Sequence, residues 1–190
     1  MLDYKIILAS QSPRRQELLS QLNIPFEIVL KDSGDEVFPA DMPYQEVPVY
    51  LAIQKAEPYK HDGIESDKIV VTADTIVCCN DEVLGKPKDK NDAARMLHML
   101  SNNEHEVITG VALTGATKQK TFTVSTKVFF KLLTAEEIAY YIDNYQPFDK
   151  AGAYGIQEWI GMIGIERIEG SYFNVVGLPV QKLYTELNEF

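Results

Sequence analysis

The chain has 190 residues, of which 45% are hydrophobic and 24% are charged, as in an ordinary globular domain. Eighteen Lys and Arg against 28 Asp and Glu give a formal net charge of −10. This charge argues against a nucleic acid polymer or an anionic membrane as a partner, because both need a basic face. A few cations gathered at one site could still bind a small polyanion.

Expected strands cover, in chain order, residues 6–9, 26–31, 69–73, 76–79, 83–84, 105–114, 121–131 and a segment near 162–168. Apolar residues at helical spacing, together with helix-start signals, predict helices that begin at residues 13, 49, 93, 135 and 180. The acidic segment 32–48 contains three prolines and predicts a loop. The pattern predicts one mixed α/β domain over 1–190, without repeats or a linker.

Local signals predict several of the boundaries. Ser12 is the expected N-cap before Pro13, and Thr134 with Glu137 forms a capping box. Pro58 should stop the short helix over 49–56. The run 76–79 either continues the strand 69–73 or opens a hairpin. The last helix should turn four side chains inward, namely Val180, Leu183, Tyr184 and Leu187.

The two cysteines, Cys78 and Cys79, are adjacent in the sequence. In a strand they would point to opposite faces, which disfavours a disulfide, and they match no common metal-ligand spacing. We expect them to be reduced core residues. The chain shows no signal-peptide layout at its start and no apolar run long enough to span a membrane. The expected location is the cytoplasm.

Polar and basic residues follow the first strand, in the order Ser10-Gln11-Ser12-Pro13-Arg14-Arg15. A junction between a strand and a helix offers free backbone N–H groups and the positive end of the helix dipole to an anion. Arginines in the first helical turn oppose that dipole, so an anionic ligand would explain their presence. The alternative is a capped helix with solvated arginines.

Asp74 and Thr75 directly follow the apolar run 69–73. A carboxylate there could orient a water molecule, accept its proton or hold a divalent metal. The alternative is a turn residue that bonds its own backbone.

Further candidates are cations and an acid from separate segments. Lys86 lies in a turn and Lys55 on the short helix, and each is either a phosphate contact or a solvated side chain. Glu36 is one acid among several in the polar loop. Trp159 could stack on a base or cover the core. The chain carries no complete phosphate-binding loop of the G-x-x-x-x-G-K-[ST] type, nor a nucleophile elbow.

Taken in order, these segments resemble the Maf (septum-formation protein) family of nucleoside triphosphate pyrophosphatases. The N-terminal block is Leu8-Ala9-Ser10-x-Ser12-Pro13-Arg14-Arg15-x-Glu17-Leu18-Leu19. Further family-like blocks follow in the same order: Asp35-Glu36, Leu51-Ala52-x-x-Lys55-Ala56, Ala73-Asp74-Thr75, Leu84-Gly85-Lys86-Pro87, Asp149 to Gln157, and Gly170 to Pro179. The resemblance extends from about Ile6 to Leu187.

The resemblance implies a mixed α/β fold with an elongated twisted sheet, flanking helices and two lobes around a central cleft, similar also to inosine triphosphatases. It implies a homodimer that hydrolyses a nucleoside triphosphate to the monophosphate and pyrophosphate, with Mg²⁺ or Mn²⁺ as cofactor. The family clears modified or surplus nucleotides and is linked to arrest of cell division.

By the family pattern, Asp74 is the general base, and Asp74 and Glu36 are the metal ligands. Lys55 and Lys86 are catalytic residues as well. They bind the triphosphate together with Ser10 and Arg15. Three further positions resemble those of the subfamily that prefers dTTP and UTP: Arg14, Thr75 and Gln157. The amide of Gln157 can both donate to and accept from a pyrimidine edge.

Two other functions remain open on the sequence. One is the same reaction on a modified or purine nucleotide, such as 7-methyl-GTP. The other is a division-control protein that senses nucleotides without hydrolysing them, although a pure sensor would not need a base at position 74.

Overall fold

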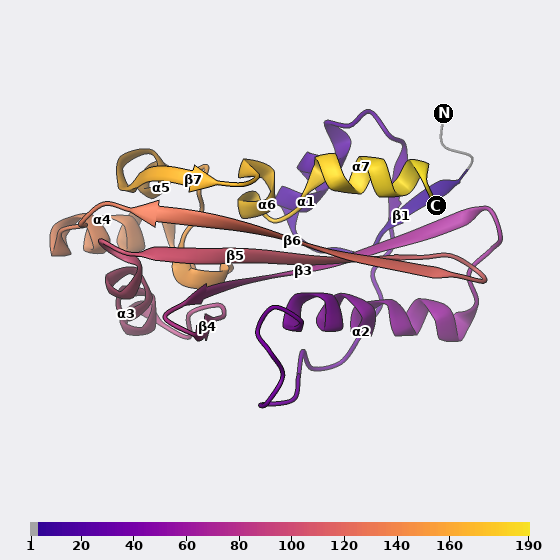
Figure 1. Cartoon of the computed structure of the whole chain (residues 1–190), viewed down its shortest axis with the longest axis horizontal. Helices are drawn as coiled ribbons and strands as arrows, with labels where there is room; N and C mark the ends of the chain where they lie inside the picture. The colour runs from indigo at the N-terminus through magenta and orange to yellow at the C-terminus, as the bar shows by residue number, and fades with distance from the viewer. Residues whose placement is uncertain (1–3) are drawn as a thin grey trace. The chain divides into compact units, whose positions relative to one another are not determined.

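A computed structural model describes residues 4–190 of the chain (Figure 1). The strands are β1 (Lys5–Leu8), β2 (Phe26–Ile28), β3 (Lys68–Cys79), β4 (Glu82–Leu84), β5 (Glu104–Thr114), β6 (Gln119–Phe130) and β7 (Ile165–Glu169). The helices are α1 (Pro13–Ser20), α2 (Val47–Asp62), α3 (Lys90–Leu100), α4 (Ala135–Tyr145), η1 (Ala151–Ala153, a 3₁₀ turn), α5 (Trp159–Gly164), α6 (Tyr172–Val176) and α7 (Val180–Asn188). The predicted mixed α/β fold is confirmed. None of the helices in this part of the chain is long and apolar enough to cross a membrane.

The strands pair in the order β2-β1-β3-β5-β6-β7, and β4 pairs with β3 outside this path. β1 runs parallel to both β2 and β3, with Leu8 opposite Ile28 and Val71. The α1 crossover allows the parallel β1–β2 pairing. β4 and β7 run antiparallel to their neighbours, so the sheet is mixed.

The chain divides into two compact units. Unit 1 comprises the described residues up to Asp74 together with Thr109–Val124 and Gly177–Phe190. Unit 2 comprises Thr75–Ile108 and Ser125–Val176. The boundary passes through β3, β5 and β6, so each of these strands contributes residues to both units.

In unit 1, α2 packs closely on the strands. The hydroxyl of Thr72 in β3 donates a 2.6 Å hydrogen bond to the carbonyl of Ala52 in α2. At Gly110 in β5, an added Cβ would fall 2.2 Å from the backbone nitrogen of Val49, so only glycine permits this approach. Figure 1 shows α7 on the opposite side of these strands, and its Leu183 is fully buried.

The predicted end of α2 at Pro58 is wrong, because the helix continues to Asp62 with Pro58 inside it. Tertiary contacts account for the continuation. Tyr59 is buried, and its hydroxyl donates to the carbonyl of Val29 at 2.6 Å and accepts from the N–H of Lys31 at 3.1 Å. These contacts hold the last turns against the chain that follows β2, which offsets the hydrogen bond that proline cannot make.

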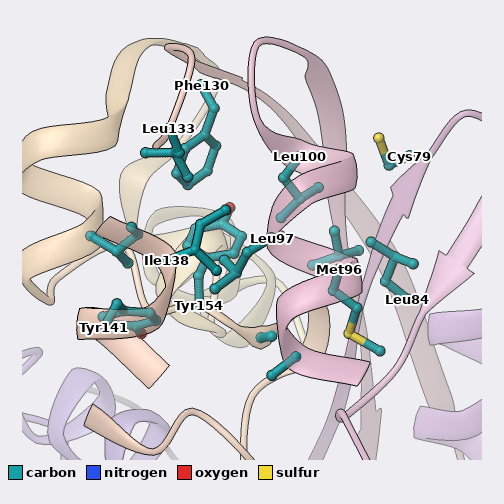
Figure 2. Packing of buried hydrophobic residues seen from close by; sticks show 14 of the residues in the cluster. Cys79, Leu84, Met96, Leu97, Leu100, Phe130, Leu133, Ile138, Tyr141 and Tyr154 are labelled. Atoms are coloured by element: carbon teal, nitrogen blue, oxygen red, sulfur yellow. The ribbon is translucent and has the colours of Figure 1, made fainter. Parts of the chain in front are cut away.

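The apolar core of unit 2 is drawn in Figure 2. Side chains from β3 and β4, from α3 and from the chain around α4 meet there, and Cys79, Leu84, Leu97, Phe130 and Tyr141 are among them. Both cysteines are free and buried, as predicted. Burial raises the pKa of the Cys78 thiol to about 11, which keeps it protonated.

Three further predictions need correction. β2 ends at Ile28 rather than residue 31, and residues 159–164 form α5, which delays the last strand to 165–169. Tyr184 of α7 is 50% exposed, so it does not belong to the inward face. A tyrosine ring can lie along a helix with its polar end in water, and apolar spacing alone does not distinguish this arrangement from burial.

Candidate active site

Ser10 follows β1 and is buried. Its hydroxyl oxygen accepts a 3.2 Å hydrogen bond from the N–H of Ser12, and its carbonyl accepts a 3.0 Å bond from the Gln16 amide. Ser12 is the N-cap of α1 and Pro13 opens the helix, as predicted, but the Ser12 side chain makes no capping hydrogen bond. The first turn of α1 also holds no acidic residue, so the positive end of its dipole is not offset locally.

Arg15 is built into the fold of unit 1 rather than solvated. Its Nε donates to the carbonyl of Gly177 and its Nη1 to the carbonyl of Ala73, each at 2.8 Å. Burial lowers the pKa of the Arg15 guanidinium, while the carboxylate of Asp74 opposes this shift. The side chain therefore joins α1, β3 and the segment before α7 close to Asp74.

Asp74 lies within β3, which continues without interruption from Lys68 to Cys79. The alternative of a turn residue is therefore wrong. The Asp74 side chain is 10% exposed, and its Oδ1 lies 2.6 Å from Nζ of Lys55, which projects from α2. The same ammonium lies 2.9 Å from Oε1 of Glu36. One lysine thus joins the two carboxylates that the sequence singles out.

Burial raises the pKa of the Asp74 carboxyl above its usual value. The charges of Lys55 and Arg15 oppose the shift, and Glu36 adds to it. A carboxylate with a raised pKa is a stronger base than an exposed aspartate. The arrangement can therefore accept a proton from a water molecule.

Glu36 is held at this position by its loop. The carboxylate of Asp32 accepts from the N–H of Gly34 at 2.9 Å, and Gly34 adopts a φ of +72°. The Gln54 amide of α2 donates to the carbonyl of Asp35 at 3.4 Å. The side chain of Glu36 is half exposed, whereas that of Lys55 is 17% exposed, so Glu36 forms the outer side of the cluster.

The donor set is suited to a hard cation only in part. Two carboxylates joined through Lys55 match the one or two acids that commonly hold Mg²⁺ while substrate phosphates supply the remaining ligands. Within residues 4–190, no group of three or more His, Cys, Asp and Glu could hold a metal ion. The residues therefore fit a metal that arrives with a phosphate ligand and not one enclosed by the protein.

Arg14 is half-buried in α1 of unit 1, and the other three predicted site residues lie in unit 2. Thr75 is half-buried in β3, and Lys86 is exposed in the turn after β4. Gln157 lines a pocket of about 450 Å³ next to Met162, Arg167 and Tyr172. Its Oε1 is buried and has no hydrogen-bond partner among the described residues. A buried acceptor of this kind favours a ligand that brings an N–H group.

Sequence reasoning missed the backbone acceptors that hold Arg15. Gly177 has a φ of +129°, a conformation that disfavours a side chain, and its oxygen accepts from Arg15 across 162 positions of sequence. The only local signal was the glycine before Leu178 and Pro179. Trp159, a candidate for base stacking, packs against the core of unit 2, and its ring lies 4.8 Å from that of Tyr140.

Comparison with known proteins shows to which family the chain belongs. A protein named dTTP/UTP pyrophosphatase from Parabacteroides distasonis is 52% identical over 187 residues, which are 98% of this chain and 96% of that protein. A protein of the same name from Porphyromonas gingivalis is 50% identical over 98% of this chain and 94% of its own length. The crystal structure of a nucleoside-triphosphatase, a dITP/XTP pyrophosphatase from Mycobacterium abscessus, covers 97% of both chains with a TM-score of 0.51; at 16% identity it is similar in fold alone. The family model described as Maf-like protein matches residues 5–190, and the chain belongs to the Maf family.

Proposed function

We propose that this protein hydrolyses dTTP and UTP to the nucleoside monophosphate and pyrophosphate. The observation that carries the proposal is the buried Asp74 carboxylate with Lys55 at 2.6 Å and a raised pKa. The names of relatives about 50% identical over nearly the whole chain support the choice of substrates. The reaction would clear surplus or modified nucleotides.

In the proposed reaction, Asp74 accepts a proton from the water molecule that attacks the α-phosphorus. A P–O bond to the water oxygen forms while the bond from the α-phosphorus to the bridging oxygen breaks, and pyrophosphate leaves with the bonding electrons. Negative charge grows on the leaving group, so cations around it stabilise the transition state. We assign this role to Lys55, Lys86 and Arg15, and Ser10 binds the same triphosphate.

Asp74 and Glu36 are the proposed ligands of Mg²⁺ or Mn²⁺. When bound, the metal would screen the triphosphate charge from these carboxylates. The chain's own contribution is to place two acids on one lysine, so that neither carboxylate lacks a counter-charge before the substrate arrives.

Base selection is assigned to Arg14, Thr75 and Gln157. Uracil and thymine present an N3–H donor between two carbonyl acceptors, and the buried, unpartnered Oε1 of Gln157 supplies an acceptor for that donor. We further propose that residues 1–190 act as one catalytic domain, that the protein works in the cytoplasm, and that it forms a homodimer.

Incubation with dTTP, UTP, CTP, ATP and 7-methyl-GTP tests the proposal, with Mg²⁺, Mn²⁺ or a chelator present. We expect pyrophosphate as the product, a preference for dTTP and UTP, and loss of turnover with the chelator. Release of orthophosphate and a diphosphate would contradict attack at the α-phosphorus. Tight nucleotide binding without turnover under either metal would favour a sensor.

A further inference from the structure

We propose that Tyr141 and Glu158 are positioning residues that keep the Gln157 carboxamide in the orientation needed for base selection. The inference rests on the proposed role of Gln157 in base selection. It assigns a role to two neighbouring side chains that the proposed function does not use. Tyr141 comes from α4 and is fully buried in the core of unit 2 (Figure 2).

The hydroxyl of Tyr141 contacts the chain on both sides of Gln157. It accepts a 3.0 Å hydrogen bond from the N–H of Gly155, two residues before Gln157. It also donates to Oε2 of Glu158, the residue directly after Gln157. One hydroxyl on a buried ring therefore bonds the backbone two residues before Gln157 and the side chain of the residue after it.

The other oxygen of Glu158 is held as well. Its Oε1 lies 3.1 Å from Nζ of Lys150, and that ammonium lies 2.7 Å from Oδ1 of Asp149. The Lys150 side chain is 9% exposed, so this ion pair is largely shielded from water. Both carboxylate oxygens of Glu158 thus have fixed partners, which restricts the side chain to one placement.

The surrounding backbone leaves this segment little freedom to shift. A Cβ at Gly155 would lie 2.9 Å from Cδ of Glu158, and a Cβ at Gly161 would lie 1.9 Å from the carbonyl oxygen of Ile156. The N–H groups of Gly161 and Met162 bond the carbonyl of Glu158 at 3.0 and 3.2 Å. Close packing at glycine therefore presses α5 against the residue before Gln157.

Base selection needs this rigidity because an amide can bond either pyrimidine. Its oxygen accepts from N3–H of uracil, whereas cytosine presents an acceptor at N3 and an amino group beside it. An amide that can shift, or rotate to exchange its oxygen and nitrogen, can bond either base, while an amide held in one orientation favours one base. The anchoring of Gly155 and Glu158 is what would keep Gln157 from adapting to cytosine.

The test compares kcat/KM for UTP and CTP in the wild type, Tyr141→Phe, Glu158→Gln and Glu158→Ala, with Tyr145→Phe as the matched control. The Tyr145 ring stacks on Tyr141 at 5.1 Å, but its hydroxyl takes no part in these contacts. We expect Tyr141→Phe and Glu158→Ala to lower kcat/KM for UTP about tenfold, mainly through KM, and to change that for CTP less than twofold. Glu158→Gln keeps an acceptor for Tyr141 and should retain most of the selectivity, and Tyr145→Phe should retain all of it.

Equal losses for UTP and CTP would reduce Tyr141 and Glu158 to a structural role and overturn the inference. If the proposed function itself is wrong, the wild type will release no pyrophosphate, which distinguishes that failure from failure of this inference. In that case equilibrium binding of UMP and CMP decides. A wild-type preference for UMP that Tyr141→Phe abolishes supports the inference, and equal affinities or no binding overturn it.

Discussion

The ammonium of Lys55 lies 2.6 Å from Oδ1 of Asp74, and this contact joins the middle of helix α2 to the middle of strand β3. The carboxylate is otherwise largely withdrawn from water, and its pKa is raised above the usual value. A charged group kept in such surroundings lowers stability, so we expect a functional reason for its presence. The first two predictions follow from this pair.

Asp74→Asn should abolish turnover while leaving the fold intact. Loss of a general base lowers rates by about 10²- to 10⁴-fold, and the amide keeps the shape of the side chain. Because the folded protein holds a proton on Asp74 more tightly than the unfolded chain, the ionised carboxylate costs stability at pH 7. The melting temperature should therefore equal or exceed that of the wild type. A wild-type rate of pyrophosphate release would remove Asp74 from the role of base.

Lys55→Met should move the acidic limb of the kcat/KM profile to higher pH. The base must be ionised, so activity falls as the pH drops through the pKa of Asp74, and Lys55 is the largest influence that keeps this pKa down. Profiles of the wild type and the variant between pH 4 and 9 measure the shift. An acidic limb that stays at the wild-type position would mean that another group titrates.

Arg15→Lys should destabilise unit 1. The guanidinium donates to the carbonyls of Ala73 and Gly177 at once, and a lysine ammonium cannot reproduce that fixed fork. Losing one such bond to a charged donor costs about 1.5–3 kcal/mol. Urea unfolding measures the free energy. Arg14→Lys serves as the comparison and should affect KM more than stability; equal free energies of unfolding for both variants would contradict the bridging role of Arg15.

His105 should give the protein an acid-sensitive core. It is buried against the rings of Phe130 and Tyr154, and its Nε2 lies 2.7 Å from the Tyr154 hydroxyl. Burial lowers its pKa from 6.5 to about 3. The stability from the neutral ring is complete above pH 6.5 and is lost as the pH falls from 6.5 toward 3, at a slope of up to about 1.4 kcal/mol per pH unit. His105→Gln should flatten this slope in unfolding experiments. Parallel curves for variant and wild type would assign the acid sensitivity to carboxylates instead.

Gly110→Ala should separate α2 from β5. The added methyl group would meet the backbone of Pro48 and Val49 at 2.2–2.5 Å, and backbone cannot move aside cheaply. We expect a loss of about 3 kcal/mol or more in the free energy of unfolding. Gly85→Ala is the matched control, because a Cβ there meets nothing within 4 Å. Similar melting temperatures for the two variants would show that α2 can shift without cost.

Features set by residues close together in the sequence form as predicted, and features set by distant residues do not. The capping box of Thr134 and Glu137 forms as predicted, because both partners lie within one helical turn. The end of α2 was missed because Tyr59 is held by residues about 30 positions away. The same reason applies to Tyr141, whose partners follow it by 14 and 17 positions and carry no recognisable motif.

In the candidate site, too, residue identities were predictable from the sequence and long-range contacts were not. Ser10, Arg15, Lys55, Asp74 and Glu36 were identified by residue type and family pattern, and the contacts among Lys55, Asp74 and Glu36 agree with that grouping. Periodicity left open whether the strand would run through Asp74 into residues 76–79, as β3 does, and it gave no sign that Arg15 would bond two distant carbonyls. Both depend on burial and on packing between elements, which single-sequence patterns do not encode.

The boundary between the two units falls between Asp74 and Thr75, and the chain crosses it again after Ile108, Val124 and Val176. No uninterrupted stretch of the gene therefore encodes either unit whole. Expressing either half of the chain alone would separate β3 from its neighbour β5 and leave open strand edges in both products. Evolution can alter this enzyme by exchanging side chains or lengthening loops, but it cannot recombine one unit with a foreign partner by a single crossover.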